Sequence, residues 1–154
     1  MKKIYSILLA LTLSLTACGG RGGQYEIGDV QAMADAGAFS EELEELDGDV
    51  AFSALYRLGD YGLEREDLTG CAVLRSAGGT CEEGAVLILD SEEDAKTAKK
   101  ALEDYVQKQI DQNESYGYRL AEIPKLKDAY IDVRGSTVLL VVASDLDAAK
   151  SVVE

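Results

Sequence analysis

Histidine and tryptophan are absent from the 154 residues, and proline occurs once. Without histidine the chain excludes His-based catalytic triads and dyads, as well as zinc or haem sites that need an imidazole ligand. The aromatic residues are limited to eight Tyr and two Phe, which gives little support for an aromatic sugar-binding platform. An enzyme could still use carboxylates, Tyr or Lys, but the usual general base is missing.

The apolar run near the start of the chain is too short to cross a membrane. As a helix, residues 4–15 cover roughly 18 Å, whereas the hydrocarbon core of a bilayer is about 30 Å thick. Lys2 and Lys3 precede this run, and small residues follow it up to Cys18. This is the layout of a cleaved secretory signal, so the sequence predicts a signal peptide at residues 1–17.

Leu15-Thr16-Ala17-Cys18 resembles the lipobox of bacterial lipoproteins. The resemblance implies that the Cys18 thiol receives a diacylglyceryl group, with fatty acids such as palmitate, and that cleavage leaves Cys18 as the first residue. At about 0.8 kcal/mol per buried CH₂, two acyl chains suffice for stable anchoring. We therefore expect a protein held on the extracytoplasmic face of the cell membrane. An ordinary secretory signal with an incidental Cys is the alternative.

The rest of the chain divides into a spacer and one domain. Residues 18–24 are rich in glycine and predict a flexible tether behind the lipidated Cys, and residues 25–154 have the size of a single domain with its own core. Loss of Lys2 and Lys3 takes the net charge from −14 to −16. Such a domain repels nucleic acid, which we exclude as a partner. The simplest role of this negative charge is to keep the domain soluble. The alternative is that it attracts a basic partner or a divalent cation.

Lipidation of Cys18 leaves Cys71 and Cys81 as a candidate disulfide, because an even pair in an extracytoplasmic protein favours one. If residues 77–79 form a tight hairpin turn, Cys71 faces residue 85 and Cys81 faces residue 75. The sulfurs are then roughly 13 Å apart, too far to bridge. A wider loop would bring the two sulfurs together, so the sequence does not decide whether the disulfide forms. The spacing is not Cys-x-x-Cys, which disfavours a catalytic redox pair.

The hydrophobic pattern predicts an α+β fold. Residues 25–70 have an irregular helical pattern, with short helices that begin near Asp29, Ser40 and Asp49. From residue 71 the period changes to that of strands, and four are predicted, at residues 71–75, 85–89, 129–134 and 137–143. Gly135-Ser136 fits a type II′ turn between the last two.

Each predicted pair of strands is followed by a helix. Ser91 with Asp94 is a capping-box-like start to the first, and Ser144 starts the second. Between them, residues 113–128 predict a loop whose apolar side chains pack inward, namely Tyr116, Tyr118 and Leu120. Two hairpins that each precede a helix predict an antiparallel-rich sheet of about four strands, with helices mainly on one face.

Together with the lipobox, four short motifs resemble a family of small Gram-positive lipoproteins known only as a domain of unknown function. The motifs are Phe39-Ser40, Leu55-Tyr56, Ala77-Gly78-Gly79 ahead of Glu83, and Val133-Arg134-Gly135. The resemblance spans about Asp29 to Val153. It implies a location and a fold, and it supplies no activity, cofactor or site. Cys71 and Cys81 look like additions specific to this chain.

These observations favour a membrane-anchored, extracytoplasmic binding or interaction module that is not an enzyme, with an unknown protein or small ligand as its partner. No cofactor, metal ligand or catalytic residue is predicted. One alternative is a divalent-cation binder that uses Glu82, Glu83, Asp90, Glu92, Glu93 and Asp94. The other is an enzyme that uses Cys71 and Cys81 as thiols, or carboxylates. Glu82 and Glu83 are poorly placed as an acid/base couple, because neighbours on a strand point to opposite faces.

Overall fold

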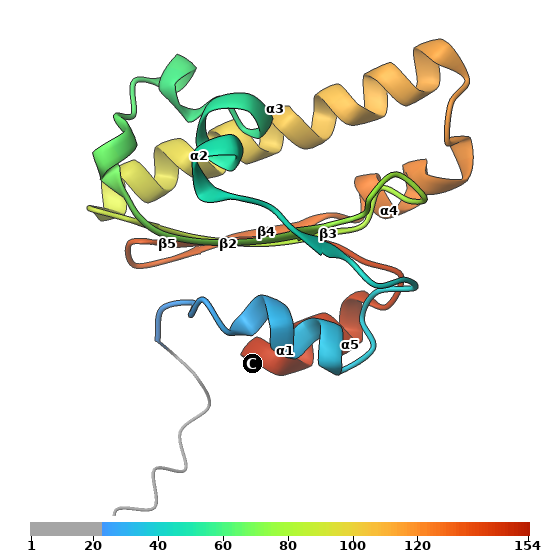
Figure 1. The fold of residues 1–154 in the computed structure, drawn as a ribbon, viewed down its shortest axis with the longest axis horizontal. Coiled ribbons are helices and arrows are strands. Elements are labelled where there is room, and N and C mark those ends of the chain that lie inside the picture. Colours follow the sequence, from blue (N-terminus) through green and yellow to red (C-terminus); the bar gives the residue numbers. More distant parts are fainter. Residues whose placement is uncertain (1–22) are drawn as a thin grey trace, which may run out of the picture.

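The computed structural model describes residues 23–154. The predicted signal peptide at residues 1–17, the predicted lipid attachment at Cys18 and the tether up to residue 22 lie outside the described residues. From residue 25 onward the chain forms the predicted α+β domain (Figure 1).

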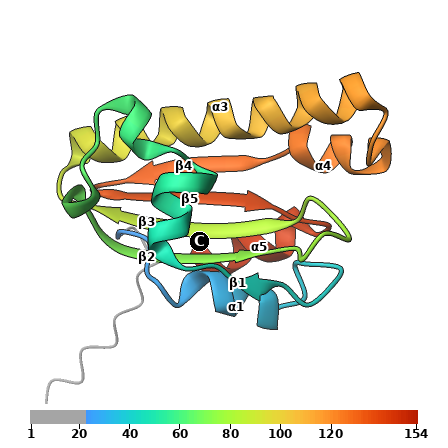
Figure 2. The same cartoon turned by 45° about the horizontal axis from the view of Figure 1, so that its top comes forward.

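Within residues 23–154, five strands form one open, wholly antiparallel sheet in the order β1-β2-β3-β5-β4 (Figure 2). The four predicted strands are all present. The strands are β1 (Glu44–Glu45), β2 (Leu68–Arg75), β3 (Glu83–Leu89), β4 (Tyr130–Arg134) and β5 (Thr137–Val142). Gly135 has a φ of 57° in the turn between β4 and β5, in agreement with the predicted glycine turn.

The fifth strand, β1, forms where a helical turn is predicted. Glu44 pairs with Arg75, and Glu45 pairs with Leu74, at the edge of β2. Ser40 caps no helix here, because its backbone N–H and its hydroxyl both donate to the carboxylate of Glu82. The pairing follows from the unpaired backbone groups of an edge strand, which the local hydrophobic pattern does not report.

Helices cover both faces of the sheet, which differs from the predicted placement mainly on one face (Figure 1). On one face lie α2 (Gly48–Val50), α3 (Glu92–Tyr116) and α4 (Ile123–Lys127), together with a π-helical turn η1 (Ala51–Leu55) and 3₁₀ turns η2 (Leu58–Tyr61), η3 (Arg65–Asp67) and η4 (Leu120–Glu122). On the other face lie α1 (Asp29–Asp35) and α5 (Leu146–Val153).

Two covered faces follow from the composition of β3 and β5. Successive residues of a strand point to opposite sides, and both strands are apolar at consecutive positions. Leu87 and Leu140 belong to the core beneath α3, whereas Val86 and Leu139 belong to the core beneath α1 and α5. The two hairpins therefore lead into helices on opposite faces.

The long helix α3 determines where a cleft forms. Ser91 caps it as predicted, because the Ser91 hydroxyl accepts a hydrogen bond from the Asp94 N–H at 3.1 Å. The helix continues to Tyr116, past residue 113 where a loop is predicted, and Gly117 ends it with a φ of 61°.

We expect Gly84→Ala to lower the free energy of unfolding by about 1–3 kcal/mol through overpacking. A Cβ at Gly84 would lie 2.9 Å from Val30 Cγ1 and 3.0 Å from Phe39 Cζ, where α1 and the segment after it approach β3. Gly28→Ala is the matched control, because a Cβ there meets nothing within 4 Å and its φ is −71°. Chemical denaturation measures both variants. A Gly84→Ala variant as stable as the parent would contradict the close approach.

Candidate functional site

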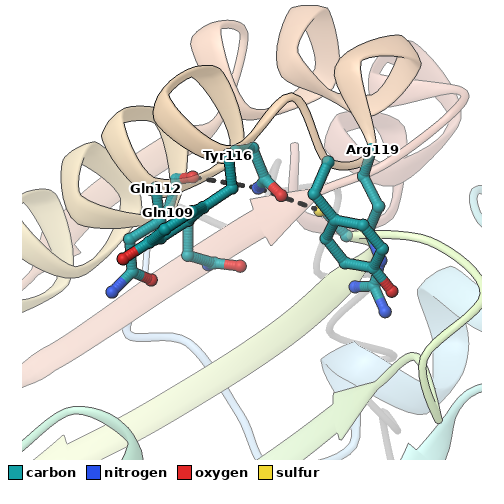
Figure 3. A pocket seen from close by; sticks show the side chains of 7 residues that line it. Gln109, Gln112, Tyr116 and Arg119 are labelled. Carbon is teal, nitrogen blue, oxygen red and sulfur yellow. Dashed lines mark hydrogen bonds between the residues drawn. The ribbon is translucent and has the colours of Figure 1, made fainter.

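A cleft of about 610 Å³ lies at the C-terminal end of α3 (Figure 3). This volume falls within the range of small-molecule sites. Among residues 23–154, its lining contains no carboxylate and consists of Cys81, Gln109, Gln112, Asn113, Tyr116, Tyr118 and Arg119. The cleft is therefore locally uncharged or positive in a chain whose net charge is −14.

One wall of the cleft is a face of α3. Gln109, Gln112, Asn113 and Tyr116 recur at helical spacing and so lie side by side on this face. The Nε2 atom of Gln109 is buried and has no hydrogen-bond partner among residues 23–154. A buried donor without an acceptor costs about 1–3 kcal/mol, so the wall offers a group that a bound acceptor would satisfy.

The opposite wall is the segment that follows α3, as Figure 3 shows for Arg119. Arg119 has a φ of 47° and turns the chain back along the β2–β3 loop. Its Nη1 donates to the Thr80 carbonyl at 3.1 Å, and its Nη2 donates to the Gly78 carbonyl. Its guanidinium carbon lies 4.8 Å from the centroid of the Tyr118 ring, in a cation–π contact. These contacts hold the guanidinium at the cleft.

Three apolar side chains at this end are exposed although the sequence predicts that they pack inward. The exposed fractions are 82% for Tyr116, 58% for Tyr118 and 56% for Leu120. The prediction is wrong because α3 extends to Tyr116, so these residues lie past the part of the helix that packs on the sheet. Gly117, a typical residue after a helix end, was the available signal for this boundary.

Cys81 forms the floor of the cleft and is buried. Its Sγ accepts a hydrogen bond from Asn113 Nδ2 at 3.8 Å, and its backbone N–H donates to Glu122 Oε2 at 3.0 Å. Sequence reasoning treats Cys81 as half of a disulfide. Its place among the amide side chains of α3 depends on a contact that spans 32 residues and that no local pattern reports.

Cys71 lies away from the cleft, in the middle of β2 opposite Leu87. Both thiols are free, so the candidate disulfide is not formed in the structure. The tight turn assumed for the register is also wrong, because Arg75 pairs with Glu83 and residues 76–82 form a wider loop. Burial raises the pKa of the Cys71 thiol to about 11, so little thiolate is present there at neutral pH.

Glu83, at the start of β3, is buried and connects the segment after η1, helix α3 and strand β2. Its Oε1 accepts a hydrogen bond from the Tyr56 hydroxyl of the segment after η1, and its Oε2 accepts one from the Tyr105 hydroxyl of α3 at 2.7 Å. Arg75 Nε lies 3.6 Å from the same Oε2. Burial raises the pKa of Glu83 in spite of these partners, which lower it.

Glu82 is also buried, but it has a separate set of partners, as expected for strand neighbours that point to opposite sides. Its carboxylate accepts hydrogen bonds from the Ser40 N–H and hydroxyl, both at 2.9 Å, and from the Ser144 hydroxyl. Lys125 Nζ lies 3.3 Å from its Oε1. Burial alone would raise the pKa of Glu82, but these hydrogen bonds outweigh it and lower the pKa.

The carboxylates considered as cation ligands do not gather. Glu82 and Glu83 stand at the start of β3 and Asp90 follows its end, so the length of the strand, about 20 Å, separates them. Glu92, Glu93 and Asp94 occupy the first turn of α3, where the helix dipole favours acids. Within residues 23–154, no group of three or more Cys, Asp or Glu side chains is placed to hold a metal ion.

We expect Glu83→Gln to change how stability depends on pH. Because burial raises the pKa of Glu83 above its ordinary value of 4.5, the folded protein retains a proton that the unfolded chain releases. The contribution of Glu83 to the free energy of unfolding is therefore full in acid and falls as the pH rises above about 4.5. Chemical denaturation from about pH 4.5 to about pH 7 should show the parent losing stability relative to Glu83→Gln.

Glu82→Gln is the matched control. The pKa of Glu82 is lowered, so its contribution is present above about pH 4.5 and is lost as the pH falls through the lowered value. The parent should therefore lose stability relative to Glu82→Gln on acidification, which is the opposite direction. A Glu83→Gln difference that is constant with pH would contradict the burial argument.

Comparison with known proteins places the domain in a family. No curated protein and no solved structure matches the chain. A family model described as a domain of unknown function, DUF4358, matches residues 55–143, which include every helix and strand from β2 to β5 and every residue that lines the cleft. The expected relation to a family without an assigned function is confirmed at this level, whereas lipidation stays a prediction. The match covers more than half of the chain, and the chain belongs to the DUF4358 family.

Proposed function

We propose that this protein is a membrane-anchored, extracytoplasmic binding module that is not an enzyme and that holds a small ligand in the cleft at the end of α3. The single observation that carries the proposal is the position of the cleft. The cleft lies at the C-terminal end of α3. Figure 1 shows this end of α3 at the end of the sheet opposite the one at which the chain enters the domain.

The entry point is defined by contacts of the first described residues. The Tyr25 N–H donates to Thr137 Oγ1 at 2.9 Å, and the Ser136 hydroxyl donates to Gln24 Oε1 at 3.2 Å. These partners lie at the β4–β5 turn, beside Leu89 at the end of β3. Cys81 lies two residues before the start of β3. The strand thus separates tether and cleft by about 20 Å.

The sequence supports the anchor. Lys2 and Lys3, the apolar run at residues 4–15 and the lipobox-like Leu15-Thr16-Ala17-Cys18 together favour lipidation of Cys18. Within residues 23–154, no helix is both long enough and apolar enough to cross a membrane. A lipid on Cys18 would leave the cleft at the end of the domain remote from the bilayer, open to solutes outside the cell.

The chemistry of the cleft supports binding rather than catalysis. Its side chains offer amide donors and acceptors, aromatic faces and a guanidinium, which are groups that orient a ligand. Tyr116, Tyr118 and Leu120 are three of the five exposed large hydrophobic residues in the described part of the chain. Exposed aromatic residues gathered at the rim of a cleft are typical of binding sites.

We expect Cys18→Ala to abolish membrane attachment, because the thiol is the predicted acceptor of the lipid. In cells fed an alkyne-tagged fatty acid, the parent should be labelled, should sediment with membranes and should be cut by protease added to intact cells. The variant should carry no label, and Cys71→Ala is the control that keeps it. Equal labelling of Cys18→Ala and the parent would contradict the anchor.

We expect the double substitution Tyr116→Ala and Tyr118→Ala to reduce ligand retention by at least about tenfold, since stacking and packing on two aromatic rings are lost. The detergent-solubilised full-length protein would be dialysed against small molecules from the culture of its host, and bound compounds quantified by mass spectrometry. Ile27→Ala with Val50→Ala, two exposed apolar residues outside the cleft, is the control. Retention unchanged by the tyrosine substitutions would contradict the assignment of the cleft.

A further inference from the structure

We propose that the cleft recognises its ligand by a carboxylate group, which the guanidinium of Arg119 binds while the amide side chains of α3 bind neighbouring polar groups. This inference rests on the proposed binding function and adds the chemical class of the ligand. It covers small organic acids that carry further hydrogen-bonding groups, such as short peptides with a free C-terminus or sugar acids.

The first argument is the state of Arg119. Four other arginines of the described chain each lie within 4 Å of a carboxylate, in the pairs Arg57–Asp60, Arg65–Asp49, Arg75–Glu83 and Arg134–Asp132. Arg119 has no carboxylate within this distance among residues 23–154, although acids outnumber bases by 29 to 15 in the whole chain. The Gly78 and Thr80 carbonyls accept its hydrogen bonds, and the side chains of Tyr118 and Cys81 also lie against it, so none of these partners is a carboxylate.

The remaining N–H groups of Arg119 are suited to a carboxylate. A guanidinium carries five N–H donors in a planar fork, and the two carbonyls take two of them. Charge-assisted hydrogen bonds from such a fork to a carboxylate are about twice as strong as neutral ones. The carbonyl contacts hold the group in place without cancelling its charge, so a ligand carboxylate would be its first anionic partner.

The surroundings of the cleft do not oppose an anion. No acidic side chain of the described residues lines it, and the nearby carboxylate of Glu122 already accepts hydrogen bonds from the Cys81 N–H and from Lys125 Nζ at 3.1 Å. The rest of the domain is strongly acidic and repels anions. Because the rest of the acidic surface repels an anionic ligand, the cleft is the favourable place for it to bind.

The α3 wall of the cleft requires hydrogen-bond acceptors from the ligand. Gln109 Nε2 is a buried donor with no partner in the described residues, and Gln112 presents a second amide on the same face of α3 (Figure 3). Carboxylate and carbonyl oxygens are acceptors of this kind. A ligand that bears a carboxylate at one end and a carbonyl or hydroxyl at the other would satisfy both walls at once.

Calorimetric titration of the detergent-solubilised full-length protein with four probes tests the inference. The probes are N-acetyl-Ala-Ala, its C-terminal amide, glucuronate and glucose, at low ionic strength. At least one acid should bind about tenfold or more tightly than its neutral counterpart, because only the acid can form charge-assisted hydrogen bonds with Arg119. Preference for the peptide acid identifies a peptide source of the carboxylate, and preference for glucuronate identifies a sugar acid.

Two variants locate the carboxylate. Arg119→Gln should remove the difference between acid and neutral probe, and Arg57→Gln, at an exposed ion pair away from the cleft, should keep it. Because Arg119 also bonds the β2–β3 loop, Gln112→Glu provides a second variant that leaves those bonds intact and adds a like charge. It should weaken the acid about tenfold and spare the neutral probe, whereas Gln107→Glu, exposed on the same helix, should change neither.

Three results would overturn the inference. They are equal affinity for the acid and its neutral counterpart, failure of every acid probe to bind in the millimolar range, and an acid preference that survives both Arg119→Gln and Gln112→Glu. The proposed binding function is judged separately by ligand retention. If Tyr116→Ala with Tyr118→Ala still lowers retention while no acid preference is found, the binding function stands and the carboxylate class fails.

Discussion

The burial of both faces of β3 and β5 is the constraint on which the rest of the structure depends. Because consecutive residues such as Val86 and Leu87 point to opposite sides and both are fully buried, the sheet requires a layer on each face. One layer is α3, which at 25 residues is about 38 Å long, whereas β3, with seven residues, is about 20 Å long. The helix therefore extends beyond the sheet. Its last turns, together with the β2–β3 loop, form the cleft.

Two adjacent buried carboxylates connect these layers at the same end of the sheet. Glu83 accepts hydrogen bonds from residues of the π-helical segment and of α3, and Glu82 accepts them from the segments before β1 and α5 and from α4. A buried ionised group lowers the stability of the fold unless it is well paired, and Glu82 is better paired than Glu83. The ammonium of Lys125 and several donors lower the pKa of Glu82, whereas burial dominates at Glu83 and raises it. The start of β3 is thus a cluster of buried polar groups among apolar core residues, and Glu82 follows Cys81 directly in the sequence.

Local chemistry predicts a large part of this fold. The alternation of the strands, the Ser91 cap and the Gly135 turn each depend on residues close together in the sequence, and all three are found in the structure. The features that the sequence does not predict depend on partners that are far away along the chain. β1 exists because β2 offers an edge, and Glu83 is buried because Tyr56 and Tyr105, 27 and 22 residues away, donate to it. The cleft combines Cys81 with residues 109–119, a juxtaposition that hairpin and helix periodicity do not contain.

The N-terminal entry to the domain gives the cleft a defined direction relative to the tether. Tyr25 is buried, its hydroxyl donates to Asp132 at 2.5 Å, and the guanidinium of Arg134 lies 4.5 Å from its ring centroid. Gln24 lies so close to Gly135 that a Cβ there would be 2.7 Å from its Nε2. The chain is therefore fixed to the β4–β5 turn already at Gln24, the last residue of the predicted tether. A lipid on Cys18 would then hold the domain by one end of its sheet, and the cleft at the other end would face away from the bilayer.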